Sequence, residues 1–241
     1  MQKAKKSLSQ NFLIDKNICK KIVKEADIKN KNILEIGPGK GVLTEFILNE
    51  NPRKLILIEK DDKLFKYLKK KYDTYNNVRV INYDILDYEI NNLKNINIIS
   101  NLPYNISTKI ILKLFKSHNI IDKMVLMLQK EVAEKFEYKN SKYNKYNFLN
   151  NLLCNYKICF IVKPNSFKPV PKVISAVVKF EFKINDIDFN KINLFIKKIF
   201  HNKRKIIGNK LKLESSELKK LQNKRIDEMN FNEILKIYDF F

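Results

Sequence analysis

The residues best suited to chemistry in this chain lie together in one tetrapeptide, Asn101–Tyr104 (Asn-Leu-Pro-Tyr). Asn101 offers a neutral carbonyl acceptor, Tyr104 offers a flat aromatic face, and Pro103 stiffens the turn because its ring fixes φ. A flat molecule with an exocyclic amine needs hydrogen-bond acceptors and a stacking surface of this kind. We favour this interpretation over a simple capped turn before the helix expected at residues 110–115.

A second candidate site is the glycine-rich loop Glu35–Gly41, which reads Glu-Ile-Gly-Pro-Gly-Lys-Gly. Three of the four glycines of the chain lie in this loop, between an apolar stretch at residues 32–34 and a helical pattern that starts at Val42. A strand, a glycine turn and a helix in this order let a nucleotide-type ligand approach bare backbone N–H groups. A ligand-binding loop is therefore favoured over a turn that binds nothing.

Two acidic residues follow the next predicted strands. Glu59 ends an apolar stretch and lies twenty residues after Gly39, a spacing typical of a carboxylate that accepts hydrogen bonds from ribose hydroxyls. Asp84 either accepts a hydrogen bond from the amino group of a bound adenine or caps a turn. Ligands of open α/β sheets gather at the carboxyl ends of the strands, so both residues and the Asn101–Tyr104 segment are expected to face one crevice.

Apolar stretches that fit strands alternate with helical patterns along most of the chain. Strands are expected at residues 32–34, 54–59, 78–81, 96–99, 124–128, 157–162 and 173–182. This alternation predicts an α/β fold with a mostly parallel sheet. From about Lys183 the pattern changes to short helices, so we predict one domain over residues 1–182 and a small basic helical domain over residues 183–241.

The charge of the chain points to a polyanionic partner. The 48 Lys and Arg residues outnumber the 26 Asp and Glu residues, for a formal net charge of +22. Codon usage could account for so much lysine, but the resulting field still attracts nucleic acid. Residues 197–212 carry seven basic side chains and no acidic one, with Lys203, Arg204 and Lys205 at their centre. That stretch is either a phosphate-contact stripe or a solvated helix face.

Other classes of site find little support in the sequence. The three cysteines, Cys19, Cys154 and Cys159, have no metal-ligand spacing, and only His118 and His201 could assist them. We therefore expect no metal and no catalytic triad that depends on histidine. No apolar run approaches the length of a membrane span, and no signal-peptide pattern opens the chain. A reducing, cytoplasmic location without membrane contact is the expectation.

Taken together, the motifs resemble a known family. The Gly-x-Gly-x-Gly loop is similar to the first motif of S-adenosylmethionine-dependent methyltransferases. The motifs stand in a fixed order, namely Ser9–Leu13, Glu35–Gly41, Asn101–Ser107 and Phe167–Ser175. This set resembles the ribosomal RNA adenine N6,N6-dimethyltransferases, of the type that modifies bacterial small-subunit rRNA, and the likeness covers nearly the whole chain. It implies a Rossmann-like class I methyltransferase domain followed by a small C-terminal helical domain.

The resemblance also implies which residues hold the cofactor, S-adenosylmethionine. Its methionine end would contact Gln10, Asn11 and Leu13, its body would lie over Gly37 and Gly39, and its nucleoside would contact Glu59 through the ribose and Asp84 through the adenine amino group. Asn101 would contact both the cofactor and the substrate.

The target adenine would be bound by a second group of residues. Asn101 and the carbonyl of Leu102 would accept the hydrogens of the target amine, and the rings of Tyr104 and Phe167 would sandwich the base. Drawing the amine toward tetrahedral geometry localises its lone pair for attack on the methyl group, which requires positioning and desolvation but no strong base. The basic residues Lys203, Arg204 and Lys205 would contact RNA phosphates.

The activity implied is dimethylation of adenine N6 in small-subunit ribosomal RNA, at two adjacent adenosines of a hairpin loop, during ribosome biogenesis. The partner would be this RNA in the subunit or its precursor, and the chain would act as a monomer. One alternative is a large-subunit rRNA methylase that confers antibiotic resistance, against which Leu102 and Tyr104 argue. Another is a non-catalytic assembly or organellar transcription factor of the same family. Ser9, Asn147 and Gly208 depart from the family pattern.

Overall fold

The structure is a computed structural model that describes residues 11–90, 93, 95–138, 143–183 and 187–241. The chain divides into two compact units. Unit 1 comprises residues 1–133 and 155–183, and unit 2 comprises residues 134–154 and 184–241. The predicted boundary after residue 182 lies close to one edge of this division, but the prediction did not place residues 134–154 in unit 2. Phe148 explains the grouping, because its ring contacts the rings of Phe195, Phe200 and Phe231 at centroid distances of 5.7–5.9 Å.

Unit 1 is built on a seven-stranded sheet in the order β4-β3-β2-β5-β6-β9-β7. Its strands are β2 (Asn32–Ile36), β3 (Lys54–Glu59), β4 (Val78–Asn82), β5 (Ile96–Asn101), β6 (Ile121–Gln129), β7 (Cys154–Val162) and β9 (Ser175–Phe182). Strands β4, β3, β2, β5 and β6 are parallel, and β9 runs antiparallel to β6. The α/β class and all seven predicted strands are confirmed. A separate two-stranded sheet joins β1 (Phe12–Leu13) to β8 (Phe167–Lys168).

Helices alternate with the parallel strands, as the sequence pattern predicts, and further helices follow the last strand. They are α1 (Lys16–Ala26), α2 (Val42–Asn49), α3 (Asp62–Lys71), α4 (Ser107–Phe115), α5 (Lys130–Phe136), α6 (Lys145–Leu153), α7 (Phe189–Phe200), α8 (Ser216–Lys219) and α9 (Phe231–Phe240), with short 3-10 turns at Pro164–Ser166, Ile207–Asn209 and Ile226–Glu228. Asp15 and Asp61 directly precede α1 and α3 and cap them, because their carboxylates accept hydrogen bonds from free N–H groups of the first turn.

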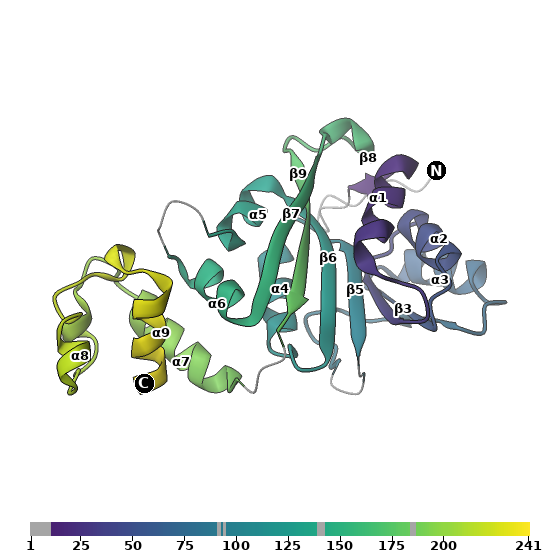
Figure 1. Cartoon of the computed structure of the whole chain (residues 1–241). Coiled ribbons are helices and arrows are strands. Elements are labelled where there is room, and N and C mark those ends of the chain that lie inside the picture. The colour runs from purple at the N-terminus through teal and green to yellow at the C-terminus, as the bar shows by residue number, and fades with distance from the viewer. Residues whose placement is uncertain (1–10, 91–92, 94, 139–142, 184–186) are drawn as a thin grey trace. The chain divides into compact units, whose positions relative to one another are not determined.

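Helices cover both faces of the sheet. On β9, Val177 belongs to the buried cluster that includes α1, whereas Phe180 contacts Phe115 of α4 at a ring-centroid distance of 5.6 Å. Residues three apart on a strand point to opposite faces, so α1 and α4 lie on opposite sides of the sheet (Figure 1). Burial on both faces explains why the strands read as nearly continuous apolar runs in the sequence.

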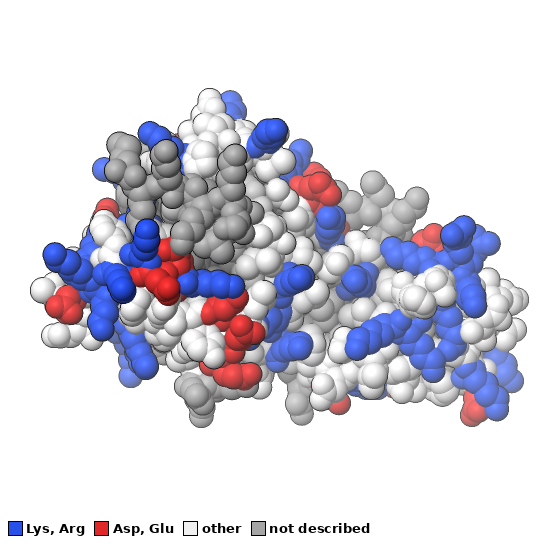
Figure 2. Space-filling view, turned by 180° about the vertical axis from the view of Figure 1, so that it is seen from behind, with Lys and Arg blue, Asp and Glu red and all other residues white. Residues whose placement is uncertain are grey.

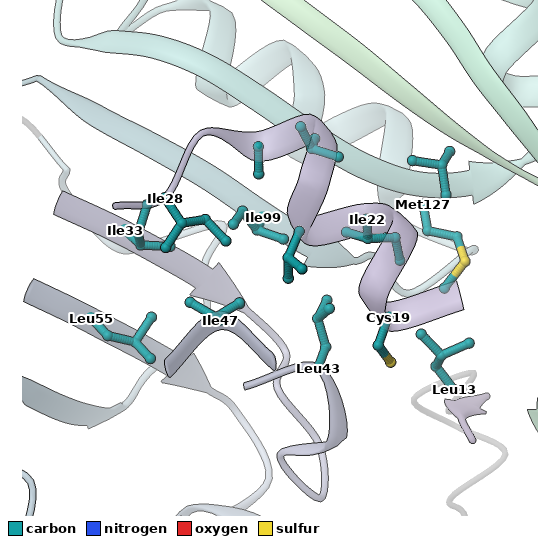
Figure 3. Packing of buried hydrophobic residues seen from close by; sticks show 14 of the residues in the cluster. Leu13, Cys19, Ile22, Ile28, Ile33, Leu43, Ile47, Leu55, Ile99 and Met127 are labelled. Carbon is teal, nitrogen blue, oxygen red and sulfur yellow. The ribbon is translucent and has the colours of Figure 1, made fainter. Parts of the chain in front are cut away.

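One buried cluster ties the N-terminal segment to the sheet. Cys19 and Ile22 of α1 pack with Leu43 of α2 and Ile33 of β2, and all four are at most 4% exposed. Leu13 of β1 lies at the edge of this cluster beside Cys19 (Figure 3). Leu13 is only 4% exposed, and its burial in this cluster stabilises the packing of β1 on unit 1.

Unit 2 has its own aromatic core. Phe148 of α6, Phe195 of α7 and Phe231 of α9 are joined by ring contacts that also include Tyr238. Basic side chains cover much of the face of this unit that is visible in Figure 2. Within the described ranges of the whole chain, no helix is long and apolar enough to cross a membrane.

Candidate active site

The parallel strands bring the predicted site residues together at one edge of the sheet. Strands β2, β3 and β5 end there, at Ile36, Glu59 and Asn101. A cavity of about 260 Å³ opens at this edge and lies wholly in unit 1. The predicted residues that line it are Asn11, Leu13, Gly37, Gly39, Glu59, Asp84, Asn101, Leu102 and Tyr104. Gln10 lies outside the described residues.

The glycine loop forms one wall of this cavity. Gly37, Gly39 and Gly41 have φ values of 62°, 61° and 75°, a conformation that favours glycine. A Cβ atom on Gly37 would meet nothing within 4 Å, so the missing side chain leaves open space along the wall. A Cβ atom on Gly41 would lie 2.6 Å from the hydroxyl of Tyr72, which donates a hydrogen bond to the Gly41 carbonyl. At Gly41 both the backbone conformation and the close packing therefore require glycine.

Glu59 links the end of β3 to the glycine loop. Its carboxylate accepts hydrogen bonds from the N–H of Gly39 at 3.1 Å and the N–H of Asp61 at 2.9 Å. The side chain is 6% exposed, and burial raises its pKa although both N–H donors lower it. A carboxylate oxygen accepts more than one hydrogen bond, so Glu59 has capacity left for ligand hydroxyls.

A second carboxyl, Glu35, is buried below the loop at the end of β2. It is 2% exposed and accepts a hydrogen bond of 2.6 Å from the Thr44 hydroxyl on α2. Burial raises the pKa of Glu35 to about 8, with a smaller contribution from the charge of Glu59, while Thr44 and Lys71 lower it. Two neighbouring carboxyls with raised pKa values therefore lie under one glycine loop, as is common at functional sites.

Asp84 forms an ion pair with Lys60 that no pattern in the sequence indicates. The ammonium of Lys60 donates to Asp84 Oδ2 at 2.6 Å, and the N–H of Leu86 donates to Oδ1 at 2.9 Å. Burial alone would raise the pKa of Asp84, but these two hydrogen bonds and the positive charges of Lys60 and Lys113 together lower it. Asp84 therefore caps a turn and also lines the cavity, and its contact with a bound adenine stays a prediction.

Asn101 is held by the N-terminal segment. Its Nδ2 donates to the backbone carbonyl of Asn11 at 2.9 Å. Its Oδ1 is buried and has no hydrogen-bond partner within the described part of the chain. A buried acceptor without a donor is costly, and such an atom in a functional cavity indicates a partner that arrives with a ligand.

Tyr104 is fixed at both ends. Its hydroxyl is 2.5 Å from the Oγ of Ser175, and its carbonyl accepts from the Ser107 hydroxyl at 3.2 Å. The Phe167 ring lies 6.4 Å from the Tyr104 ring at an interplanar angle of 77°, and Phe167 is only 1% exposed. These rings meet edge to face in the structure, so a sandwich around a base requires one of them to turn, and that role stays a prediction.

The three basic residues Lys203, Arg204 and Lys205 belong to unit 2 and do not line the cavity. All three lie in an exposed turn after the end of α7. They are therefore exposed to solvent but not on a helix, so the alternative of a solvated helix face is wrong about the helix. Within the described ranges, no ion pair involves any of the three. Lys210 of the same stripe is different, because its ammonium donates to the Ile199 carbonyl.

Some cavity residues were not predicted. Phe12 and Lys60 both line the cavity. Phe12 covers the glycine loop, since a Cβ atom on Gly39 would lie 3.0 Å from two of its ring carbons. Lys60 directly follows Glu59, so its place at the carboxyl edge of the sheet could have been inferred from the same strand argument. Among the described residues, no group of three or more His, Cys, Asp or Glu side chains could hold a metal ion.

The sheet order and the glycine loop define a class I methyltransferase fold, and comparisons with known proteins agree. The family model for ribosomal RNA adenine dimethylase matches residues 1–241, so the chain belongs to the ribosomal RNA adenine dimethylase family. The chain is 39% identical to ribosomal RNA small subunit methyltransferase A of Hydrogenobaculum sp. over 99% of its own length and 94% of that protein. It is 45% identical to the protein of the same name from Pelagibacter ubique, over 76% of this chain and 72% of that protein.

Solved structures of methyltransferases have a fold similar to that of this chain. A dimethyladenosine transferase from Plasmodium falciparum matches with a TM-score of 0.80 and 27% identity, over 94% of this chain and 95% of that one. The 23S rRNA methyltransferase ErmE matches with a TM-score of 0.77 at 22% identity, over 95% of this chain and 98% of that one, which shows a shared fold.

Proposed function

We propose that this protein transfers methyl groups from S-adenosylmethionine to N6 of adenine in small-subunit ribosomal RNA and completes two transfers per base. The observation that carries this proposal is the buried, unpartnered Oδ1 of Asn101 beside the cavity. An exocyclic amine supplies the donor that this acceptor lacks. The named relatives that match over nearly the whole chain support the choice of RNA.

The residues present fit the cofactor. The open space at Gly37 admits a ligand close to the backbone, and Glu59 has acceptor capacity for ribose hydroxyls. Asp84 has two oxygens at the cavity, each engaged by one donor, so it can also accept the adenine amino group. S-Adenosylmethionine, when bound, supplies an electrophilic methyl group on a sulfonium sulfur. Asn11 and Leu13 would hold its methionine end.

The chain's own residues then prepare the amine. Asn101 Oδ1 accepts one amine hydrogen, and the Leu102 carbonyl is proposed to accept the other, which localises the nitrogen lone pair. Tyr104 offers its ring face to the target base, which must be unstacked from its neighbours to reach the cavity. The nitrogen would gain the methyl carbon as its bond to the sulfonium sulfur breaks, which leaves a neutral thioether, and the nitrogen would then release one proton to solvent. Positioning and exclusion of water carry most of the effect, because no strong base is required.

The decisive experiment maps dimethyladenosine in both ribosomal RNAs by mass spectrometry, from cells with and without the gene. We expect the modification in the small-subunit RNA to disappear without the gene and to return when purified protein is added to immature small subunits. Loss of a mark in the large-subunit RNA instead would redirect the proposal to that RNA. An unchanged pattern in both RNAs would refute the enzymatic role.

A further inference from the structure

Strand β1 is only two residues long, yet it contacts β8 on one side and the glycine loop of the cavity on the other. It pairs antiparallel with β8, with Phe12 opposite Lys168 and Leu13 opposite Phe167 (Figure 1). The pairing continues at Ile14, whose N–H donates to the Ser166 carbonyl at 2.9 Å. The segment that contains Phe167, the residue predicted to contact the base, is therefore hydrogen-bonded to the N-terminal segment.

The other side of β1 faces the glycine loop. The Phe12 ring lies against Gly39, and the ammonium of Lys40 lies 5.3 Å from the centre of that ring. Leu13 anchors the strand in the hydrophobic core. Together these contacts fix the position of the backbone at the residue just before β1, which is Asn11.

The carbonyl of Asn11 determines which way the Asn101 amide points. A primary amide can turn by 180° and exchange its donor and its acceptor. The Asn11 carbonyl only accepts, so it selects the orientation in which Nδ2 faces the N-terminal segment, at 2.9 Å. The opposite orientation would bring two carbonyl oxygens to that distance and would leave Nδ2 in the place of the acceptor. An amide in that orientation cannot accept a hydrogen from the target amine.

We infer that β1 is a positioning element for methyl transfer, because its pairing with β8 holds the Asn11 carbonyl that orients the Asn101 amide. This inference rests on the proposed function and adds to it a role for a backbone carbonyl outside the residues that touch the base. The glycine loop and the segment that contains Phe167 are coupled through this one strand. Loosening β1 from β8 therefore lowers the rate of transfer even when cofactor and RNA are saturating.

The test uses a substitution at Ile14, a residue outside the cavity whose side chain is 50% exposed. Ile14→Pro removes the N–H that donates to Ser166, whereas the matched control Ile14→Ala keeps it. Single-turnover methylation of immature small subunits is measured at saturating S-adenosylmethionine and RNA. We expect Ile14→Pro to lower the rate roughly ten- to a hundredfold, as misplacement of a reacting group by about 1 Å does, and Ile14→Ala to stay close to wild type.

A double-mutant comparison separates positioning from general damage. In an Asn101→Ala background the amide is absent, so Ile14→Pro should produce no further loss of rate. An equal loss in both backgrounds, or equal rates for Ile14→Pro and Ile14→Ala, would overturn the inference. If the wild type fails to methylate adenine at all, the proposed function falls first, and the two failures are thus distinguishable.

A measurement on the unaltered protein covers the case in which Ile14→Pro does not fold. The side-chain amide signal of Asn101 in a ¹⁵N NMR spectrum is assigned by its absence in Asn101→Ala. We expect the amide hydrogens to exchange slowly with solvent, because Nδ2 donates a hydrogen bond to the Asn11 carbonyl. Exchange as fast as that of an exposed asparagine would also overturn the inference.

Discussion

The cavity of unit 1 and the basic turn of unit 2 are two kinds of candidate binding surface. In the cavity Glu59 and Glu35 are buried and hydrogen-bonded, whereas Asn101 Oδ1 is buried without a hydrogen-bond partner among the described residues. In the turn around Lys203 and Lys205 the side chains are exposed, and no ion pair to them occurs within the described ranges. Desolvation strengthens each interaction in the first region, whereas in the second water and salt weaken each charge. We therefore expect single residues to matter in the cavity and the number of charges to matter in the turn.

The largest effect is expected at Asn101. Asn101→Ala removes the acceptor that is proposed to act on the amine during transfer, so the rate should fall by about a hundred- to a thousandfold. Binding of S-adenosylmethionine and RNA should change much less, because the interaction strengthens in the transition state. Single-turnover kinetics with mono- and dimethyladenosine resolved by mass provide the measurement. Dimethylation at a near-normal rate would contradict the role of the amide.

A smaller effect on cofactor affinity is expected at Glu59. Glu59→Gln keeps the size of the side chain but removes the charge that accepts hydrogen bonds, so affinity should fall roughly ten- to a hundredfold. Asp122→Asn makes the same change at the opposite, amino end of the sheet, where the side chain is exposed, and should leave affinity unaltered. Calorimetric titration of both variants decides the matter. Equal affinities would remove Glu59 from the cofactor site.

The buried carboxyl of Glu35 should affect the free energy of unfolding rather than the affinity for a ligand. Its pKa is raised from 4.5 to about 8, so the folded protein binds this proton more tightly than the unfolded chain does. The stability that the proton contributes is full below pH 4.5 and is lost as the pH rises toward 8. Glu35→Gln cannot titrate, so relative to wild type its free energy of unfolding should rise by roughly 1–3 kcal/mol between pH 5 and pH 8. Denaturant unfolding at both pH values measures this, and parallel profiles would show that Glu35 does not titrate there.

Much of unit 1 could be predicted because its signals are local. Glycine spacing, apolar strands and an acidic residue at a strand end give the loop, the sheet and the place of Glu59, since parallel strands put their carboxyl ends at one edge. The partner of Asp84 was missed because Lys60 is one of many lysines, and sequence alone does not show which lysine turns toward which carboxylate. The same limit applies to the hydrogen bond between Asn101 and Asn11, which spans ninety residues.

Unit 2 was harder to predict for a related reason. Its core is assembled from rings on separate segments, and α6 joins it through Phe148 although the sequence of unit 1 resumes directly afterwards. No local pattern distinguishes a helix that packs on the sheet from one that packs elsewhere. The turn that contains Arg204 was expected as a stripe or a helix face because charge was the signal, and charge does not specify secondary structure.

The last prediction concerns this turn, and it should leave the chemical step unchanged. Replacement of Lys203, Arg204 and Lys205 by alanine removes three positive charges at one place. If each contacts a phosphate, the logarithmic dependence of RNA affinity on salt should flatten by about two to three units.

A control with the same loss of charge distinguishes contact from the general field. Alanine at the exposed residues Lys29, Lys31 and Lys54, at the amino end of the sheet, also removes three charges. This control should change the salt dependence of RNA affinity by less than about one unit, because charges that do not contact the RNA are screened from it at physiological salt. The single-turnover rate at saturating RNA should be that of wild type in both variants. Equal slopes in the two triple variants would mean that the turn contributes only to the overall charge. The turn would then not be a binding surface with phosphate contacts of its own.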